Sequence, residues 1–462
     1  MTQTLGIGIA LMALASVLVS PRAYSAETFF RGSDIEGRAP SLWTLILSQV
    51  TTWIFARSLM NAAILGYFYG IAGAVAYAAY YLSFVTGAWI VDSLRFRHGA
   101  SSIQAFLDDR FGRVGTGCFN VVVGVRLLSE VFANLLVVGL LFGAAGSTGY
   151  VVAVLATAGA ILGYSALGGL RASLRTDVLQ CAAMFALLAI LVVQTIGQGD
   201  FALDAVLTST PDPASPGWVL LAVALLQVVS YPLHDPVMMD RGFLADRDTT
   251  RRSFMHAAWI SILCILVFGL IGVYAGLHRM PGEAMMPALE RMFPFASMIV
   301  FNLVLIVSAM STMDSTLCSA AKLTVIDMGV ARPTLRNGRL AMTGFMVGGL
   351  ALLFLGSNDL FEAVAVSGTA SMFLAPVAVL SIWMGRRDVP VWSYLAAFAA
   401  SMAGAVIYFL ESSSYTALVG PLTGYDHKYT QLLIICIAVL AIGFAAFAAG
   451  ILLGRRSAGR EQ

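Results

Sequence analysis

The stretch VSAMSTMDSTLCSAA, residues 307 to 321, lies in a hydrophobic segment but carries polar side chains where apolar ones are expected. Helical residues spaced three or four positions apart share one face. Such a helix therefore presents a strip of oxygen atoms, which predicts a polar site inside an apolar environment. The residues concerned are Ser308, Ser311, Thr312, Asp314 and Ser315.

The composition of the chain places this helix in a lipid bilayer. Of its 462 residues, 59% are hydrophobic and only 11% are charged, and its mean hydropathy is +0.85. Soluble domains of this length are far more polar. Apolar runs long enough to cross a hydrocarbon core of roughly 30 Å recur along the whole sequence. We therefore expect one all-α polytopic membrane domain over residues 1–462.

Thirteen transmembrane helices account for these apolar runs. Their expected spans are 4–20, 41–64, 67–92, 117–143, 148–168, 174–197, 217–236, 254–277, 294–325, 340–356, 361–384, 390–410 and 430–453. Cytoplasmic loops collect Lys and Arg. Twenty-one such residues, Arg241 among them, fall in alternate loops or the C-terminal tail, and the other loops hold only Arg279, Arg291 and Lys428. This asymmetry predicts a bacterial-type inner-membrane protein with its N-terminus outside and its C-terminus in the cytoplasm.

Several function classes are disfavoured by the sequence. The first span has the length of a signal peptide, but Arg22 follows it and no positive charge precedes its apolar run, so we expect an anchor. The five cysteines lie singly, which is typical of packing residues rather than metal ligands. No phosphate-binding loop and no Ser/His/Asp constellation appears. We therefore expect no ATP-driven pump, no enzyme, no enzymatic cofactor, no nucleic-acid binding and no obligatory protein partner.

Two of the expected spans carry signs of interruption. The span 41–64 holds polar residues through its middle, and Pro232 and Pro236 follow the apolar part of the span 217–236. These are the second and the seventh expected spans, so each begins a unit of five helices. Because five is odd, the second unit crosses the membrane in the opposite direction to the first. The chain then divides into a leading segment (1–40), two inverted repeats (41–197 and 217–384) and two trailing helices (390–454). This pattern predicts a secondary transporter with its site at the membrane midplane.

Charged residues inside the expected spans are functional candidates, because each costs roughly 2.5 to 3.5 kcal/mol on insertion scales. Hydroxyl groups combined with a carboxylate suit a hard monovalent cation, whereas a proton carrier needs only the carboxylate. Small polar residues that allow close helix packing are the alternative explanation of the hydroxyl groups. The charged candidates are Arg57, Glu130, Asp177 and Asp314, with Arg126 and Lys322 nearer an edge.

Three stretches resemble the sodium/solute symporter family, which includes sodium/proline, sodium/galactose and sodium/sialic acid symporters. YSALGGLRASLRTDVLQ (164–180) is similar to its Tyr...Gly-Gly-Leu...Thr-Asp-Val-x-Gln stretch. SAMSTMDSTLCSAAKLTVIDM (308–328) resembles its sodium-binding helix, and FFRGSDIEGRAPSLWTLILSQVTTW (29–53) resembles the segment leading into its first core helix. The resemblance implies a LeuT-like five-plus-five inverted-repeat core and sodium as the coupling ion.

The resemblance also implies two sets of sodium ligands. The first set is the backbone carbonyl groups of Thr51, Ile54 and Ser308 with the hydroxyl groups of Ser311 and Thr312. The second set, present in some members, would be Asp177, Ser311, Asp314 and Ser315. Asp314 stands where a hydroxyl residue is common, so ligating sodium, holding a proton and pairing with Lys322 are its three alternatives. For Asp177 the alternative is an interfacial residue bonded to Arg175 or water.

Family substrate contacts correspond here to residues beside the two interrupted helices. They are Phe55, Arg57, Ser58, Gln227 and Tyr231, and we also count Glu130 among the expected substrate residues. The family does not generally have an arginine at the position of Arg57. Because a guanidinium binds a carboxylate bidentately, Arg57 favours an acidic or amino-acid-like solute. An ion pair between Arg57 and Glu130 is the alternative. We expect His234 and Asp235 at the cytoplasmic mouth.

The sequence as a whole predicts sodium-coupled symport of a small organic solute. Proton-coupled symport and a solute sensor that works with a separate signalling partner stay open. Only about nine residues, GRRSAGREQ, follow the last span, which argues against a fused signalling domain.

Overall fold

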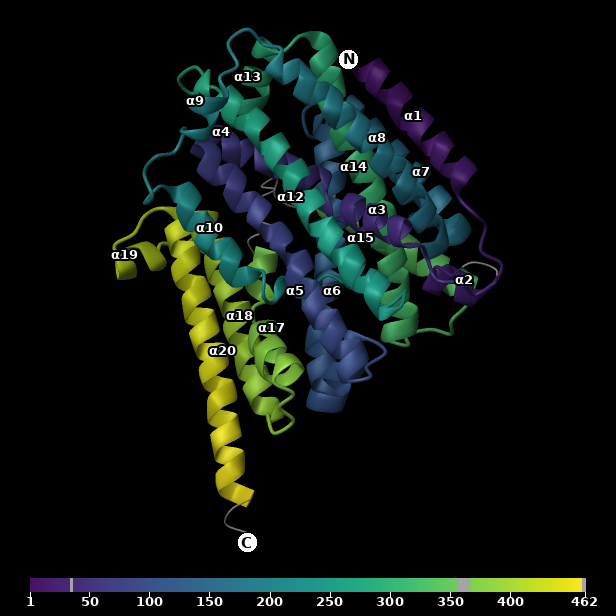
Figure 1. The fold of residues 1–462 in the computed structure, drawn as a ribbon, viewed down its shortest axis with the longest axis vertical. Helices are drawn as coiled ribbons and strands as arrows, with labels where there is room; N and C mark the ends of the chain where they lie inside the picture. The colour runs from purple at the N-terminus through teal and green to yellow at the C-terminus, as the bar shows by residue number, and fades with distance from the viewer. Residues whose placement is uncertain (34–35, 356–365, 459–462) are drawn as a thin grey trace.

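A computed structural model describes residues 1–33, 36–355 and 366–458, and the described residues form helices and loops with no β-strand (Figure 1). In chain order the helices are α1 (Thr2–Val19), α2 (Ala26–Arg31), α3 (Leu42–Trp53), α4 (Ala56–Ala79), α5 (Ser83–Asp92), α6 (Ile103–Leu140), α7 (Thr148–Gly168), α8 (Leu170–Ile196), α9 (Leu203–Leu207), α10 (Pro216–Gln227), α11 (Pro236–Gly242), α12 (Arg247–Leu277), α13 (Met285–Met292), α14 (Phe295–Lys322), α15 (Leu335–Leu355), α17 (Leu374–Pro376), α18 (Val391–Ser412), α19 (Val419–Thr423) and α20 (Lys428–Ala458).

Ten helices of the described residues are long and apolar enough to cross a membrane, so the chain is an integral membrane protein. The number of such helices is not the number of membrane crossings. The long segment Ala56–Arg97 is one of the ten, but Gly70, with φ 62° and ψ −152°, breaks its helix into two parts. Two shorter apolar helices, Pro216–Gln227 and Leu374–Trp383, are not among the ten. The total of thirteen stays a prediction, and the expected span 361–384 begins outside the described residues.

The first expected interruption is the break between α3 and α4. Ile54 (φ −84°, ψ 78°) and Phe55 (φ −68°, ψ 151°) leave the helical conformation. β-Branched and aromatic residues before the break lower the local helix propensity. The Asn134 side-chain carbonyl accepts a hydrogen bond from the Ala56 N–H at 3.2 Å, which satisfies a free donor at the start of α4. The residues before the break are Thr51, Thr52, Trp53 and Ile54.

The second interruption lies between α10 and α11. A 3₁₀ turn, Tyr231–His234, connects them, and Pro236 opens α11 at a position where its missing N–H removes no helical bond. The Asp235 carboxylate accepts a hydrogen bond from the Met238 N–H at 3.0 Å and caps α11. The helical segment thus continues to Gly242, and the expected end of this span at residue 236 is wrong. Arg241, which we expected in a loop, is 0% exposed inside the protein.

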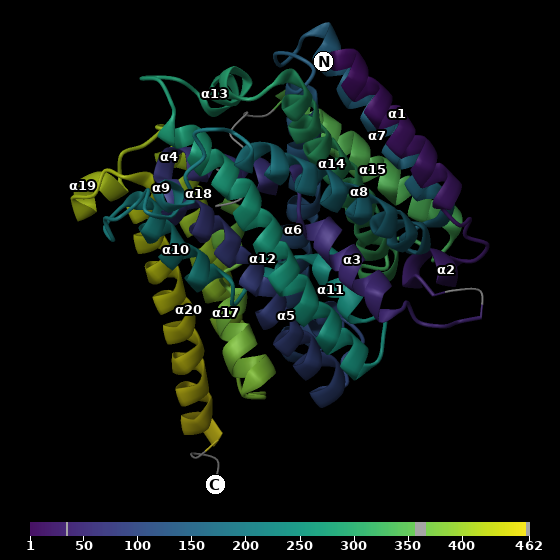
Figure 2. The same cartoon turned by 45° about the horizontal axis from the view of Figure 1, so that its top comes forward.

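α14 is the central helix of the bundle and packs against α8, α6, α15 and α3. Nearly all of its residues from Phe301 to Ala321 are buried. In both views α1 lies at one edge of the molecule, while α18 and α20 lie side by side at another (Figures 1 and 2). The hydroxyl-bearing stretch of the sequence is therefore at the core, where it meets both broken helices.

Glycines bring α4 and α12 into backbone contact. A Cβ atom at Gly272 would lie 2.0 Å from the Ala63 carbonyl oxygen. We therefore expect Gly272→Ala to lower the free energy of unfolding by about 1–3 kcal/mol, because the two helices would have to separate. Thermal unfolding in detergent measures this loss. Gly159→Ala on α7 is the control, since nothing lies within 4 Å of its Cβ position. An equal loss in both variants would contradict the prediction.

Candidate functional site

The break after α3 lies against the hydroxyl face of α14. The Ser308 hydroxyl donates a hydrogen bond to the Ile54 carbonyl, and the Ser311 hydroxyl donates to Asp177 Oδ1 at 3.1 Å. The hydroxyl groups of Thr51 and Thr312 are buried and have no hydrogen-bond partner within the described ranges of the chain. Carbonyl groups at a helix end also lack intrahelical donors. Because uncharged oxygen atoms of this kind are ligands for a hard cation, the first set of predicted residues has the chemistry that a sodium ion requires.

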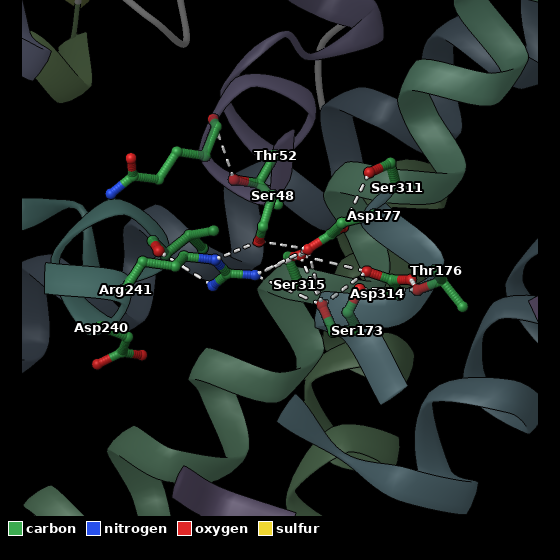
Figure 3. A network of polar contacts seen from close by, with 12 residues as sticks. Ser48, Thr52, Ser173, Thr176, Asp177, Asp240, Arg241, Ser311, Asp314 and Ser315 are labelled. Carbon is green, nitrogen blue, oxygen red and sulfur yellow. Dashed lines mark hydrogen bonds and ion pairs between the residues drawn. The ribbon is translucent and has the colours of Figure 1, made fainter. Parts of the chain in front are cut away.

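The second set of predicted ligands forms a hydrogen-bonded network between α8 and α14 (Figure 3). Asp314 accepts hydrogen bonds from Thr176 Oγ1 at 2.7 Å and from Ser173 Oγ at 3.1 Å. Asp177 accepts one from Ser48 Oγ at 2.6 Å. Both carboxylates are 0% exposed. The alternative of an interfacial Asp177 bonded to Arg175 or water is therefore wrong.

Lys322 does not pair with Asp314, so that alternative is also wrong. Its ammonium group lies 2.7 Å from Asp240 and 3.1 Å from Asp327. Asp240 in turn accepts a hydrogen bond from Ser319 Oγ at 2.8 Å. Among the described residues, no Lys, Arg or His nitrogen lies within 4.0 Å of the Asp314 carboxylate.

Arg241 contacts residues of the second set of predicted ligands, and sequence reasoning missed this contact. Its Nη2 donates to Ser315 Oγ at 2.7 Å and lies 3.4 Å from Asp177 Oδ2, and its Nε donates to Ser48 Oγ at 3.1 Å. Figure 3 shows the guanidinium extending from α11 toward Asp177. The sequence signal that could have pointed to it is Pro236, since proline is favoured at the first position of a helix and so permits a second helical segment that includes Arg241.

A second charged network lies beside the helix breaks. Arg126 Nη2 is 2.5 Å from Glu130 Oε1 and 2.9 Å from Asp235 Oδ2. Trp53 Nε1 also donates to Asp235 Oδ2, at 2.9 Å. Arg126 is 1% exposed and Asp235 and His234 are 0% exposed. Protein therefore encloses Arg126, His234 and Asp235 on all sides. Their expected places, Arg126 near a membrane edge and His234 and Asp235 at the cytoplasmic mouth, stay predictions.

Arg57 is a buried cation with no carboxylate partner among the described residues. It is 1% exposed, and its Nε and Nη1 atoms have no hydrogen-bond partner among the residues that the structure describes. Its guanidinium lies 5.6 Å from the centre of the Phe55 ring. In the part of the chain that the structure describes, no carboxylate lies within 4.0 Å of it, and Glu130 is held by Arg126. The alternative of an Arg57–Glu130 ion pair is therefore wrong.

The other predicted substrate residues lie among aromatic side chains that sequence reasoning missed. The Tyr77 hydroxyl donates to Ser58 Oγ at 3.2 Å, and the Tyr80 hydroxyl donates to Gln227 Oε1 at 2.9 Å. The Tyr231 ring packs against Trp53, Tyr80 and His234, and lies 5.5 Å from the Arg126 guanidinium. The structure thus brings residues from α4, α10 and the 3₁₀ turn to one region, enclosed by rings and polar groups.

Comparison with known proteins identifies the fold. No family model and no curated protein matches the sequence. A sodium-coupled sialic acid symporter in a substrate-bound outward-open state matches with a TM-score of 0.71 and 15% identity, covering 97% of each chain. The chain has the LeuT fold. Mhp1, a nucleobase-cation-symport-1 family transporter in a closed conformation, gives a TM-score of 0.60 at 15% identity over 94% of this chain and 95% of that chain.

A mutant of the Eremococcus coleocola manganese transporter also matches, with a TM-score of 0.51 and 13% identity over 90% of this chain and 95% of that chain. These neighbours are all transporters, and their low identities show the shared fold alone. The resemblance to the sodium/solute symporter family stays a prediction.

Proposed function

We propose that this protein is a secondary transporter that couples the uptake of a small organic anion to sodium. The observation that carries the proposal is the contact of the Ile54 carbonyl with α14. Beside it lie the buried hydroxyl groups of Thr51 and Thr312, which have no partner in the described part of the chain. Buried polar groups without partners are costly, so a bound cation would stabilise the site. The sodium ligands would be the carbonyl groups of Thr51, Ile54 and Ser308 and the hydroxyl groups of Ser311 and Thr312.

Arg57 supports an anionic solute. Its guanidinium is buried next to the first break and has no carboxylate within 4.0 Å among the described residues, so a solute carboxylate would supply the missing counter-charge. Glu130 is already bound to Arg126 and acts as a positioning residue in this proposal. The remaining solute contacts would come from Phe55, Ser58, Gln227 and Tyr231. An organic acid or an amino-acid-like compound meets this description.

Sodium would bind from outside, bridge the end of α3 to α14, and favour the state that binds solute. A cavity of about 1450 Å³ lined in part by Arg95, Arg113, Asp240 and Lys322 would be the cytoplasmic exit in the expected orientation, with the N-terminus outside. One charge crossing 100 mV supplies about 2.3 kcal/mol, and a tenfold sodium gradient about 1.4 kcal/mol more. For a zwitterionic, amino-acid-like solute these two contributions together support accumulation of roughly several hundredfold per sodium ion. A monoanion cancels the charge of the sodium ion, so the sodium gradient alone supports roughly tenfold accumulation.

A thermal-shift screen of the purified protein tests this function. Organic acids, their amides and amino acids are compared in sodium, potassium and choline. We expect stabilisation by carboxylates in sodium, and little in potassium or choline. Uptake that proceeds equally well in choline with an imposed pH gradient would instead favour proton coupling. Solute binding without any uptake into vesicles would favour a sensor.

A further inference from the structure

The guanidinium of Arg241 lies among the residues predicted to hold a second sodium ion (Figure 3). It is 0% exposed and contacts Asp177 and Ser315, which are two of the four residues in that set. We propose that Arg241 is a fixed cation that takes the place of a second sodium ion, so that the chain binds a single sodium ion. This inference rests on the proposed function, because it concerns the sodium stoichiometry of the same site.

The oxygen atoms that a second sodium ion would need already hold hydrogen bonds within the protein. Arg241 Nη2 donates to Ser315 Oγ at 2.7 Å and to Ser173 Oγ at 3.4 Å. The same two hydroxyl groups lie 3.2 Å and 3.1 Å from Asp314 Oδ1, so they link the guanidinium to the second carboxylate. A sodium ion in this space would have to displace the arginine from its acceptors.

The charges of the cluster also match one sodium ion. Asp177 and Asp314 carry two negative charges when ionised, and Arg241 carries one positive charge, which leaves one negative charge. Ser311 connects this cluster to the first sodium site, since its hydroxyl donates to Asp177 Oδ1 at 3.1 Å. One sodium ion at the first site therefore balances the buried charge. A second ion would add an unbalanced charge beside a guanidinium, in an interior where unpaired charges are costly.

Further hydrogen bonds fix the Arg241 side chain in this position, whereas a transported ion is released. Nη1 donates to the Val237 carbonyl of its own helix at 3.0 Å, and Nε donates to Ser48 Oγ on α3 at 3.1 Å. Its contacts thus join α3, α8, α11 and α14. A sodium ion at this position would be released in each cycle, whereas a covalently attached guanidinium stays. The position therefore has a structural cation in place of a coupling ion.

Equilibrium binding of radiolabelled sodium to the purified full chain in lipid nanodiscs, without solute, tests the proposal. We expect wild type to bind one sodium ion per chain. Arg241→Gln should bind two, because Asp177 then loses its ion pair and the cluster holds two carboxylates with no fixed cation. Arg241→Lys keeps the positive charge and should bind one. Adding Thr312→Ala to Arg241→Gln should weaken the first site by about tenfold and leave the second site unchanged, so the two ions should then bind with separate midpoints.

Two sodium ions per wild-type chain would overturn this proposal and leave sodium coupling intact. An unchanged value of one in folded Arg241→Gln would overturn it as well. If Arg241→Gln does not fold, the values for wild type and Arg241→Lys decide, since two ions in either contradict a fixed cation. No sodium binding by wild type would overturn both this proposal and the proposed function.

Discussion

Thr312→Ala is expected to raise the sodium concentration for half-maximal stabilisation of the protein by about tenfold or more. The Thr312 hydroxyl is buried and finds no hydrogen-bond partner among the described residues, and in the proposed site it is a direct ligand of the ion. Tenfold corresponds to about 1.4 kcal/mol, the order of one lost polar contact in a buried site. The measurement is a sodium titration of the melting temperature of the purified protein, with choline chloride keeping the ionic strength constant.

The matched control for this substitution is Thr324→Ala, near the end of the same helical segment. The Thr324 hydroxyl donates to the Ala320 carbonyl at 2.8 Å, which is a back-bond within its own helix. We expect its sodium dependence to equal that of wild type. If Thr312→Ala changed only the melting temperature and left the sodium midpoint unchanged, the α14 hydroxyl groups would serve helix packing.

The architecture is predictable where the signal is local. Long apolar runs mark helices such as α12 and α20, and β-branched residues mark the break after α3. The ends of the interrupted helices are harder to predict, because a proline stops one helix and starts the next with equal ease. The apolar pattern predicts a helix end at Pro236, whereas this residue is the first of α11.

The candidate site is predictable to the extent that one helix carries it. Helical spacing alone places Ser308, Ser311 and Thr312 on one face of α14. The partners of these residues come from distant segments, and spacing contains no information about them. Arg126 and Glu130 are four residues apart on one helix, but Asp235, the other partner of Arg126, is 109 residues away.

Arg241 shows a different limit of sequence reasoning. The expectation that it lies in a loop follows from the rule that most arginines of membrane proteins lie there. This rule is statistical, and it fails for a residue on α11, the short buried second half of an interrupted helix. Its buried partners, Asp177, Ser48 and Ser315, compensate the cost that the rule reflects.

Arg57→Gln is expected to abolish binding of the solute without lowering the stability of the solute-free protein. Arg57 has no ion pair among the described residues, so its removal leaves no buried carboxylate uncompensated. Arg126→Gln is the matched comparison, because Glu130 and Asp235 would both lose their cation. Removing one member of a buried ion pair typically costs about 3–5 kcal/mol. Thermal unfolding without solute, and binding of a carboxylate found in the screen, are measured on both variants.

Glu130→Gln separates the two roles further, because its effect depends on which arginine it accompanies. In the Arg126→Gln background it removes one of the two unpaired carboxylates, so part of the lost stability should return. In the Arg57→Gln background it should restore neither binding nor uptake. The opposite pattern, in which Arg57→Gln unfolds the protein and Glu130→Gln rescues it, would show that Arg57 braces the helices. The site would then have no free cation for the solute, and a neutral compound would fit it better than an acid.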